Sequence, residues 1–165
     1  LAITDELTGL YNRRHLDDML AEEVTRATRY KVPLSILFFD IDHFKKFNDK
    51  HGHDQGDRVL EGVASMCKQV IRETDKCCRY GGEEFLVILP ATGLPESKLT
   101  AERLRVAIEN MFVDGLKITI SIGVAEFPYN KPISSEIFVT IADKALYQAK
   151  DEGRNRIVCA DVDNS

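Results

Sequence analysis

Apolar residues recur at steps of three and four positions in several stretches of the chain, a spacing typical of amphipathic helices. The first stretch, Asn12 to Tyr30, ends just before Pro33, which cannot continue a helix. The third begins in a polar, glycine-containing loop, Gly52 to Asp57, with Asp54 or Asp57 as its N-cap. We expect helices in residues 12–30, 43–52, from 54 or 57 to about 73, 97–111 and 134–150.

Shorter apolar runs lie between these stretches and predict strands at residues 34–40, 76–80, 84–89, 118–122 and 156–160. The run at 34–40, LSILFFD, is apolar without alternation until its last residue, so we expect a central strand covered on both faces. Residues 118–122 alternate between isoleucine and a hydroxyl residue, which predicts one buried face. Gly81-Gly82 indicates a two-residue hairpin turn, because both glycines can take positive φ.

The order of these elements is α-β-α-α-β-β-α-β-α-β. It predicts an α+β fold with helices packed on a mixed sheet. With 165 residues the chain is long enough for one domain with a core and too short for two.

Composition supports a globular domain, since 44% of the residues are apolar and 30% are charged. No apolar run reaches membrane-spanning length and no secretory signal is visible, so we expect a cytoplasmic domain without membrane contact. The net charge of −5 lacks the basic surplus of a nucleic-acid-binding protein. The cysteines have no zinc spacing and are interpreted as reduced core thiols; they are Cys67, Cys77, Cys78 and Cys159.

Two carboxylates stand at the ends of predicted strands. Asp40 closes the most apolar run, and Glu83 precedes the strand that follows Gly81-Gly82. If these strands are neighbours, the two carboxylates meet at one edge of the sheet, where their repulsion raises a pKa unless a cation lies between them. Magnesium suits such a site, because it uses one or two carboxylates and completes its shell with water and phosphate oxygens. The alternative is a hairpin with solvated acids.

The segment RYGGEEF, residues 79–85, resembles the signature of the GGDEF family of diguanylate cyclases in its GGEEF form. Four further segments match the family's motifs in order: DELTGLYNRR (5–14), FFDIDHFKKFND (38–49), GHDQGD (52–57) and ADKALYQAKDEGRNR (142–156). The resemblance implies a mostly antiparallel central sheet flanked by helices, related to adenylyl cyclase catalytic domains and polymerase palms. It also implies that residues 1–165 are one catalytic domain, expected at the C-terminal end of a longer regulated protein because the chain starts at Leu1.

Members of this family condense two GTP molecules into cyclic di-GMP and release two pyrophosphates. Each 3′-hydroxyl attacks the α-phosphate of the other nucleotide. By similarity, Asp40, the backbone carbonyl of Ile41, and Glu83 bind two magnesium ions, for which manganese can substitute. Glu84 assists either in metal binding or in proton removal.

The resemblance also assigns the guanine side of the site. Asp57 would accept hydrogen bonds from N1–H and the 2-amino group of guanine, with Asn48 beside it. Leu7 and Leu60 would pack against the base, and His53 would touch it. Adenine lacks this pair of donors, so we expect ATP to be rejected. The alternative for Asp57 is a helix N-cap.

For the phosphates, the resemblance implies Lys45 and the backbone amides near Phe44, at the start of a helix, where anions bind well. Lys150 and Arg154 look like the family's pair for the β- and γ-phosphates. The alternative is that these two cations face solvent.

A possible control site is Arg72-Glu-Thr-Asp75, an RxxD sequence with five residues between it and Gly81. This is the spacing of the family's product-binding inhibitory site. Arg72 would bind guanine or phosphate of cyclic di-GMP, Asp75 would accept from guanine, and Arg103 would be a second basic contact. The alternative is a surface ion pair at a helix end.

The product contains two symmetric phosphodiester bonds, whereas one domain holds one GTP. Catalysis therefore requires a second copy of the domain, face to face, and an upstream region would supply dimerisation and sensing. The competing function is a non-catalytic receptor for GTP or cyclic di-GMP. Degenerate relatives of that kind lose motif acids or glycines, and all are present here. A template-directed polymerase palm is disfavoured by the acidic balance and the short chain.

Overall fold

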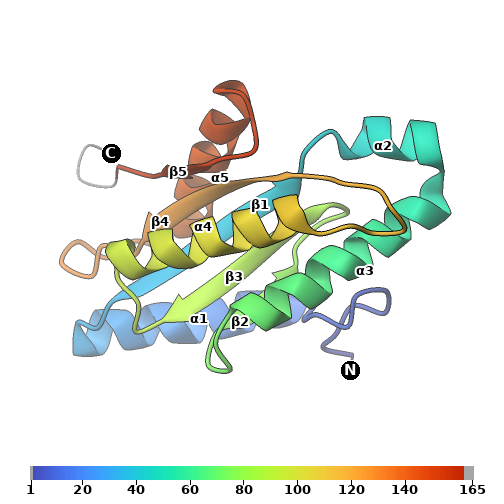
Figure 1. Cartoon of the computed structure of the whole chain (residues 1–165). Helices are drawn as coiled ribbons and strands as arrows, with labels where there is room; N and C mark the ends of the chain where they lie inside the picture. Colours follow the sequence, from blue (N-terminus) through green and yellow to red (C-terminus); the bar gives the residue numbers. More distant parts are fainter. Residues whose placement is uncertain (1, 162–165) are drawn as a thin grey trace.

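The sheet at the centre of the molecule carries helices on both faces (Figure 1). The computed structural model describes residues 2–161. Its helices are α1 (Arg13–Tyr30), α2 (Phe44–His51), α3 (His53–Val70), α4 (Leu94–Asn110) and α5 (Ser135–Asp151). Its strands are β1 (Leu34–Ile41), β2 (Lys76–Arg79), β3 (Glu84–Pro90), β4 (Ile120–Glu126) and β5 (Ile157–Cys159). The α+β class and the expected element order are confirmed.

The strands lie in the order β2-β3-β1-β4-β5. Neighbouring strands are antiparallel, except that β4 and β5 run parallel. The apolar run LSILFFD, extended by Ile41, forms β1 in the middle of the sheet, and all 8 residues of β1 are buried. The prediction of a central strand covered on both faces is confirmed.

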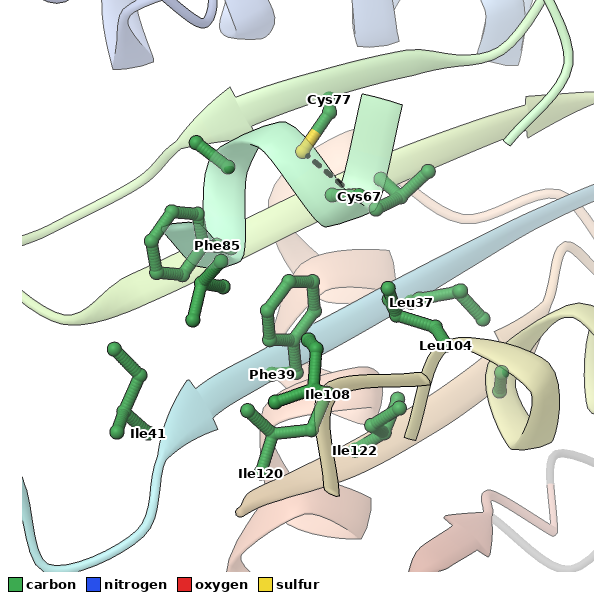
Figure 2. Packing of buried hydrophobic residues seen from close by; sticks show 14 of the residues in the cluster. Leu37, Phe39, Ile41, Cys67, Cys77, Phe85, Leu104, Ile108, Ile120 and Ile122 are labelled. Carbon is green, nitrogen blue, oxygen red and sulfur yellow. Dashed lines mark hydrogen bonds between the residues drawn. The ribbon is translucent and has the colours of Figure 1, made fainter. Parts of the chain in front are cut away.

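Alternate residues of β1 serve two separate cores, because successive side chains of a strand point to opposite faces. Phe39 packs with α3 and α4, where it stacks on Phe85 of β3 with ring centroids 5.1 Å apart (Figure 2). Phe38 packs with α1 and α5. Asp40 lies two residues after Phe38 in the same strand, so its side chain points to the same face as Phe38, the face covered by α1 and α5.

Gly123 of β4 lets α5 approach the sheet closely. A Cβ atom at this position would lie 2.2 Å from the carbonyl oxygen of Ala142 and 2.4 Å from the backbone nitrogen of Leu146. Any larger residue would therefore displace the α5 backbone. Because Lys150 lies in the last turn of α5, Gly123 also fixes the distance of Lys150 from the strand ends.

The expected loop at Gly52–Asp57 is wrong. Helix α3 begins at His53, and Gly52, with φ of 91°, is the single residue between α2 and α3. Its amide closes α2 on the carbonyl of Asn48 at 2.7 Å, and its carbonyl accepts from Gly56 at 3.1 Å. Asp57 thus lies inside the helix and is not its N-cap. One glycine with positive φ makes the turn for which the polar residues suggested a loop.

The expected two-residue turn at Gly81-Gly82 is also wrong. Neither glycine has positive φ, and the amides of Tyr80 and Gly81 both donate to the carbonyl of Glu84, at 2.8 and 3.2 Å. The turn therefore contains Gly81, Gly82 and Glu83. A Cβ at position 81 would lie 2.5 Å from a carboxylate oxygen of Glu84, so a larger residue there would require the Glu84 side chain to move.

Strand β4 has two buried faces where the alternation of isoleucine with Thr119 and Ser121 predicted one. Ser121 is buried, and its hydroxyl is satisfied by donating to the carboxylate of Asp42 at 2.6 Å. The pattern therefore reflected a buried hydrogen bond and not exposure to solvent.

The remaining boundaries follow local signals. Asn12 caps α1 by accepting from the amide of His15 at 2.9 Å, and Ser134 caps α5 by accepting from Ile137 at 3.1 Å. Helix α4 starts three residues before the expected position, with Pro95 in its first turn, where proline is well tolerated. Within residues 2–161, no helix combines the length and apolarity needed to cross a membrane.

Candidate active site

Asp40 presents a buried and incompletely satisfied carboxylate at the end of β1. Its side chain is 4% exposed, and the ammonium group of Lys150 contacts its Oδ2 atom. Its Oδ1 atom is buried and has no hydrogen-bond partner in the described part of the chain. A buried acceptor in this state costs free energy, and native proteins keep few of them. The carboxylate is therefore a candidate ligand for a cation.

The charges around Asp40 and Glu83 show that the two carboxylates influence each other's surroundings. Burial raises the pKa of Asp40 from 3.8 to about 6, against the opposing effect of Lys150, and the charges of Glu83 and Asp42 raise it further. Burial likewise raises the pKa of Glu83, which Lys150 lowers and Glu84 raises. Because Lys150 acts on both acids and each is perturbed by a neighbouring carboxylate, the structure brings the predicted acids together at one end of the sheet.

The sheet register explains this convergence. Asp40 pairs with Glu84 across β1 and β3, so Glu83 in the turn lies one residue beyond the pair. Ile41 ends β1 with its side chain buried in the core, which leaves only its backbone for a ligand. Arg79 holds the turn in place by donating to the carbonyl of Gly82 from Nε at 3.1 Å and Nη2 at 2.8 Å.

The donor set fits a magnesium ion that shares its shell with a substrate. Within residues 2–161, no three His, Cys, Asp or Glu side chains stand close enough to enclose a metal by themselves. Magnesium does not need such a cage, since one or two carboxylates, water and phosphate oxygens suffice. Asp40 and Glu83 would supply the carboxylates, and Oδ1 of Asp40, which has no hydrogen-bond partner within the described residues, is a free acceptor.

Asp42 belongs to the same motif but is a structural residue, and no role was predicted for it. Its Oδ1 accepts from Ser121 at 2.6 Å, and its Oδ2 accepts from the hydroxyl of Thr119 at 2.6 Å and the amide of Asn155 at 3.0 Å. These bonds tie the end of β1 to β4 and to the turn after α5. The hydroxyl residues at 119 and 121 were the signal that could have identified this role.

Asp5 and Arg79 were likewise missed, although both lie in motif segments. Asp5 accepts from the amide and hydroxyl of Thr8 at 2.9 and 2.8 Å and from Nη1 of Arg79 at 3.2 Å. Since the same guanidinium holds the carbonyl of Gly82, the opening segment braces the turn that carries Glu83. The opposite charges of Asp5 and Arg79, each in a motif segment, could have indicated that the two residues form an ion pair.

The residues expected around guanine gather where α2 meets α3. The Oδ1 atom of Asn48 is buried without a hydrogen-bond partner among residues 2–161. A Cβ at Gly56 would lie 1.9 Å from that atom, so Gly56 makes room for the Asn48 amide. Asp57 is the next residue of α3, and its exposed carboxylate makes no hydrogen bond or ion pair with the described part of the chain.

The other residues of this group lie nearby. His53, Asp57 and Leu60 are spaced by four and three positions, which places them on one side of α3. Leu60 is 3% exposed, His53 is exposed, and Leu7 packs partly buried against the core that contains Leu60.

The cations expected near the phosphates lie at helix ends. Lys45 is exposed in the first turn of α2, where no side chain caps the backbone amides. Arg154 follows α5 with φ of 64°, in a turn closed by its amide on the carbonyl of Ala149 at 2.9 Å. Lys150 contacts Asp40, so it lies at the sheet edge that carries Asp40, Glu83 and Glu84, which we call the acidic edge. Its side chain is 33% exposed and is therefore only partly in contact with solvent.

The RxxD residues lie at the opposite end of the sheet. The Nη2 atom of Arg72 donates to Oδ1 of Asp75 at 3.1 Å and to the carbonyl of Pro90 at 3.2 Å, and the backbone amide of Arg72 donates to Oδ2 at 2.8 Å. The side chain of Asp75 is 2% exposed and that of Arg72 is 53% exposed. Arg72 and Asp75 therefore form an ion pair after the end of α3, but the carboxylate of Asp75 is buried and not at the surface as the alternative expected. Binding of cyclic di-GMP at these residues stays a prediction. Arg103 caps the end of α3 by donating to the carbonyl of Val70 at 2.9 Å.

Comparisons with known proteins show which sequences and folds the chain resembles. The sequence model of the family described as "Diguanylate cyclase, GGDEF domain" matches residues 2–156. Response regulator PleD of Caulobacter vibrioides is 44% identical over 96% of this chain and 36% of its own length. Diguanylate cyclase DgcP of Pseudomonas aeruginosa is 43% identical over 96% of this chain and 24% of its length. The chain thus spans about a quarter to a third of these relatives.

Two solved structures show the same fold. The GGDEF domain of DgcB from Caulobacter crescentus, in complex with c-di-GMP, superposes with a TM-score of 0.90 at 36% identity, covering 96% of each chain. The active GGEEF domain of a diguanylate cyclase from Vibrio cholerae superposes with a TM-score of 0.86 at 35% identity, covering 91% of this chain and 97% of that one.

Proposed function

The chain belongs to the GGDEF family of diguanylate cyclases, and on that premise we propose that it condenses two GTP molecules into cyclic di-GMP and two pyrophosphates. The observation that carries this proposal is the carboxylate of Asp40. It is buried, its pKa is raised to about 6, and one of its oxygens has no partner. Such perturbed acids gather at catalytic sites.

Asp40, Glu83 and the backbone carbonyl of Ile41 would hold two magnesium ions, with Glu84 beside them. When bound, the metal acidifies the attacking hydroxyl and neutralises charge on the leaving pyrophosphate. Lys150 is placed to share its positive charge between Asp40 and a phosphate oxygen. Glu84, paired with Asp40 across the sheet, completes the acidic edge as a further metal ligand or as the base for the hydroxyl proton.

Specificity for guanine would come from Asp57. Its exposed carboxylate has no partner within the described chain, so it is free to accept from N1–H and the 2-amino group of guanine together. Asn48 adds an acceptor, His53 lies next to the base, and Leu7 and Leu60 offer apolar contact. ATP would leave this acid unpaired, which disfavours it by a factor on the order of 10⁴.

The triphosphate would lie between two helix ends. The uncapped amides at Phe44 and Lys45, at the start of α2, provide donors for an anion. Lys45, Lys150 and Arg154 supply the positive charge that a triphosphate requires, and Lys150 already reaches the metal ligands.

Turnover would need two copies of the domain facing one another, since each supplies one GTP and each bond joins two nucleotides. The reaction would take place in the cytoplasm, with an upstream region of the full-length protein bringing the copies together. Cyclic di-GMP, which is bound in the DgcB complex, would act as an inhibitor at Arg72 and Arg103. Asp75, whose carboxylate is occupied by Arg72, would fix that guanidinium in place of the direct guanine contact expected from the resemblance.

The test is incubation of the chain with GTP and magnesium, followed by mass analysis of the nucleotides. We expect cyclic di-GMP and pyrophosphate, a rate per molecule that rises with protein concentration, and no product from ATP. Glu83→Gln, which keeps the shape and removes the charge, is the matched control and should remain folded and inactive. A receptor would instead bind GTP or cyclic di-GMP and leave GTP unconverted, and that result would overturn the proposal.

A further inference from the structure

Two buried cysteines lie beneath the segment that carries Arg72 and Asp75. Cys67 is in the last turn of α3 and Cys77 is in β2, and their sulfur atoms are 3.1 Å apart. Figure 2 shows the two side chains pointing toward each other between α3 and the sheet. Both belong to regular elements, so this approach is fixed by the packing of α3 on β2 and not by a loop.

The other two cysteines are placed differently. Cys78 follows Cys77 in β2 and therefore points to the opposite face of the sheet, into the core shared with α1 and α5. Cys159 lies in β5, at the other edge of the sheet. Within residues 2–161, Cys67 and Cys77 are the cysteines whose sulfur atoms are in contact.

The pair is asymmetric in its access to solvent. Cys67 is fully buried, whereas Cys77 is 5% exposed and lines a hollow of about 500 Å³. Tyr11, Lys68 and Arg72 line the same hollow. A small oxidant that enters it would therefore meet Cys77 first. The hydrogen bond with Cys67 and burial raise the pKa of the Cys77 thiol, so the reactive thiolate is scarce and oxidation should be slow.

We propose that Cys67 and Cys77 are a reversible redox pair that a hydroperoxide converts to a disulfide. The sulfur of Cys77 attacks a peroxide oxygen, the O–O bond breaks, and with hydrogen peroxide the products are a sulfenic acid and water. The sulfur of Cys67 then attacks the sulfenic sulfur, the S–O bond breaks, and a second water leaves with the remaining thiol proton. The two thiols lose two electrons and two protons in total, and a dithiol reductant restores them.

The bond would close a short loop around the RxxD segment. A disulfide requires the sulfur atoms to approach to about 2.0 Å, so the two atoms must move closer by about 1 Å. The closed loop, residues 67–77, contains Arg72 and Asp75. Because the cross-link restricts the open states of this loop, local unfolding of the segment becomes rarer in the oxidised protein. This inference concerns the thiols alone and stands whether or not the chain is a cyclase.

The test is peptide mapping of the whole, folded chain after exposure to hydrogen peroxide and alkylation of the remaining thiols. Trypsin should release residues 59–68, which contain Cys67, and residues 77–79, which contain Cys77 and Cys78. We expect the two peptides linked, two hydrogens lighter than their sum, and separated by dithiothreitol. A folded protein that yields no linked peptide after hours in excess peroxide would overturn the proposal.

Matched variants identify the sulfur atoms. Cys78→Ala should keep the link, whereas Cys67→Ala and Cys77→Ala should each abolish it. A link that disappears with Cys78→Ala would contradict the assignment. If a variant fails to fold, fragmentation of the wild-type linked peptide decides between Cys77 and Cys78. Hydrogen exchange gives an independent measure: amides in residues 69–76 should exchange at least several-fold more slowly in the oxidised protein, and equal rates would refute the loop closure.

Discussion

The two ends of the central sheet each hold a buried aspartate beside a basic residue, but the two carboxylates are satisfied to different degrees. Asp40 contacts one ammonium group, that of Lys150, and its other oxygen has no partner in the described chain. Asp75 receives the backbone amide and two side-chain nitrogens of Arg72, which bind both of its oxygens. The sheet register places the two at opposite ends, since Asp40 pairs with Glu84 and Lys76 pairs with Ile88.

This difference distinguishes a carboxylate that can bind a ligand from a carboxylate that has a structural role. Removal of a buried carboxylate whose hydrogen bonds are all made is expected to cost stability, because its partners are left without an acceptor. An unsaturated one with a raised pKa destabilises the folded state, and is retained where a ligand uses it. Asp40 is therefore interpreted as a catalytic residue, and Asp75 as a residue that positions Arg72.

The largest effect is expected from Asp40→Asn. Loss of the metal ligand should lower the rate of cyclic di-GMP formation by about a thousandfold, on the order of 4 kcal/mol of transition-state stabilisation. The fold should persist, since the amide has the same shape. Product formation followed by chromatography gives the rate, and Asp54→Asn, at an exposed acid in the first turn of α3, is the control. Activity within tenfold of the wild type would remove Asp40 from the site.

A second effect should appear in the pH dependence of stability. The pKa of Asp40 is raised from 3.8 to about 6 in the folded state, so the folded protein binds the extra proton between these values. Stability contributed by this group is thus present below pH 4 and is lost as pH rises to 6, by up to ~3 kcal/mol.

Urea unfolding in metal-free buffer at several pH values would measure this effect. Asp40→Asn should lack that decrease and should exceed the wild type in stability at pH 7. The same pH profile in both proteins would show that ionisation of Asp40 does not lower the free energy of unfolding.

A third effect, of opposite sign, is expected at the other end of the sheet. Asp75→Ala removes the acceptor for Arg72 and should lower the free energy of unfolding by ~2 kcal/mol, less than for a fully buried pair because Arg72 is half exposed. The initial rate of product formation per folded molecule should not change. Urea denaturation measures the first quantity and the GTP assay the second. A change below about 0.5 kcal/mol would mean that Asp75 is no structural anchor.

The smallest effect is expected from Gly56→Ala. The new Cβ would collide with Oδ1 of Asn48 and displace its amide, so GTP affinity should fall about tenfold, or ~1.4 kcal/mol. The helix itself should not weaken, because alanine favours helix over glycine. Titration of GTP gives the affinity. In an Asn48→Ala background the same change should have little further effect, and fully additive losses would show that Gly56 acts elsewhere.

The sequence predicted the element order, the central strand and the acids at its end, because apolar periodicity and strand ends are local features. It did not predict the roles of the glycines. Gly52 turns the chain in one residue, Gly81 lies against the Glu84 side chain within one turn, and Gly56 makes room for the Asn48 side chain where α2 meets α3. These contacts depend on the path of the backbone in space, which apolar periodicity does not show.

The sequence also did not show how many hydrogen bonds each carboxylate accepts, because the donors are distant along the chain. Asp40 and Asp42 are two positions apart and look alike in sequence, yet Asp42 receives Thr119, Ser121 and Asn155, which lie far along the chain. Only the assembled sheet shows which of the two acids keeps an oxygen free.

The metal site at Asp40 and Glu83 is tested most directly by manganese binding, measured by electron paramagnetic resonance in the presence of a GTP analogue that cannot react. It requires neither turnover nor a facing pair of domains. We predict that Asp40→Asn and Glu83→Gln each weaken manganese binding at least tenfold, whereas Asp75→Ala leaves it unchanged. Equal manganese binding by the wild type and Glu83→Gln would show that Glu83 is not part of a metal site at the Asp40 end of the sheet.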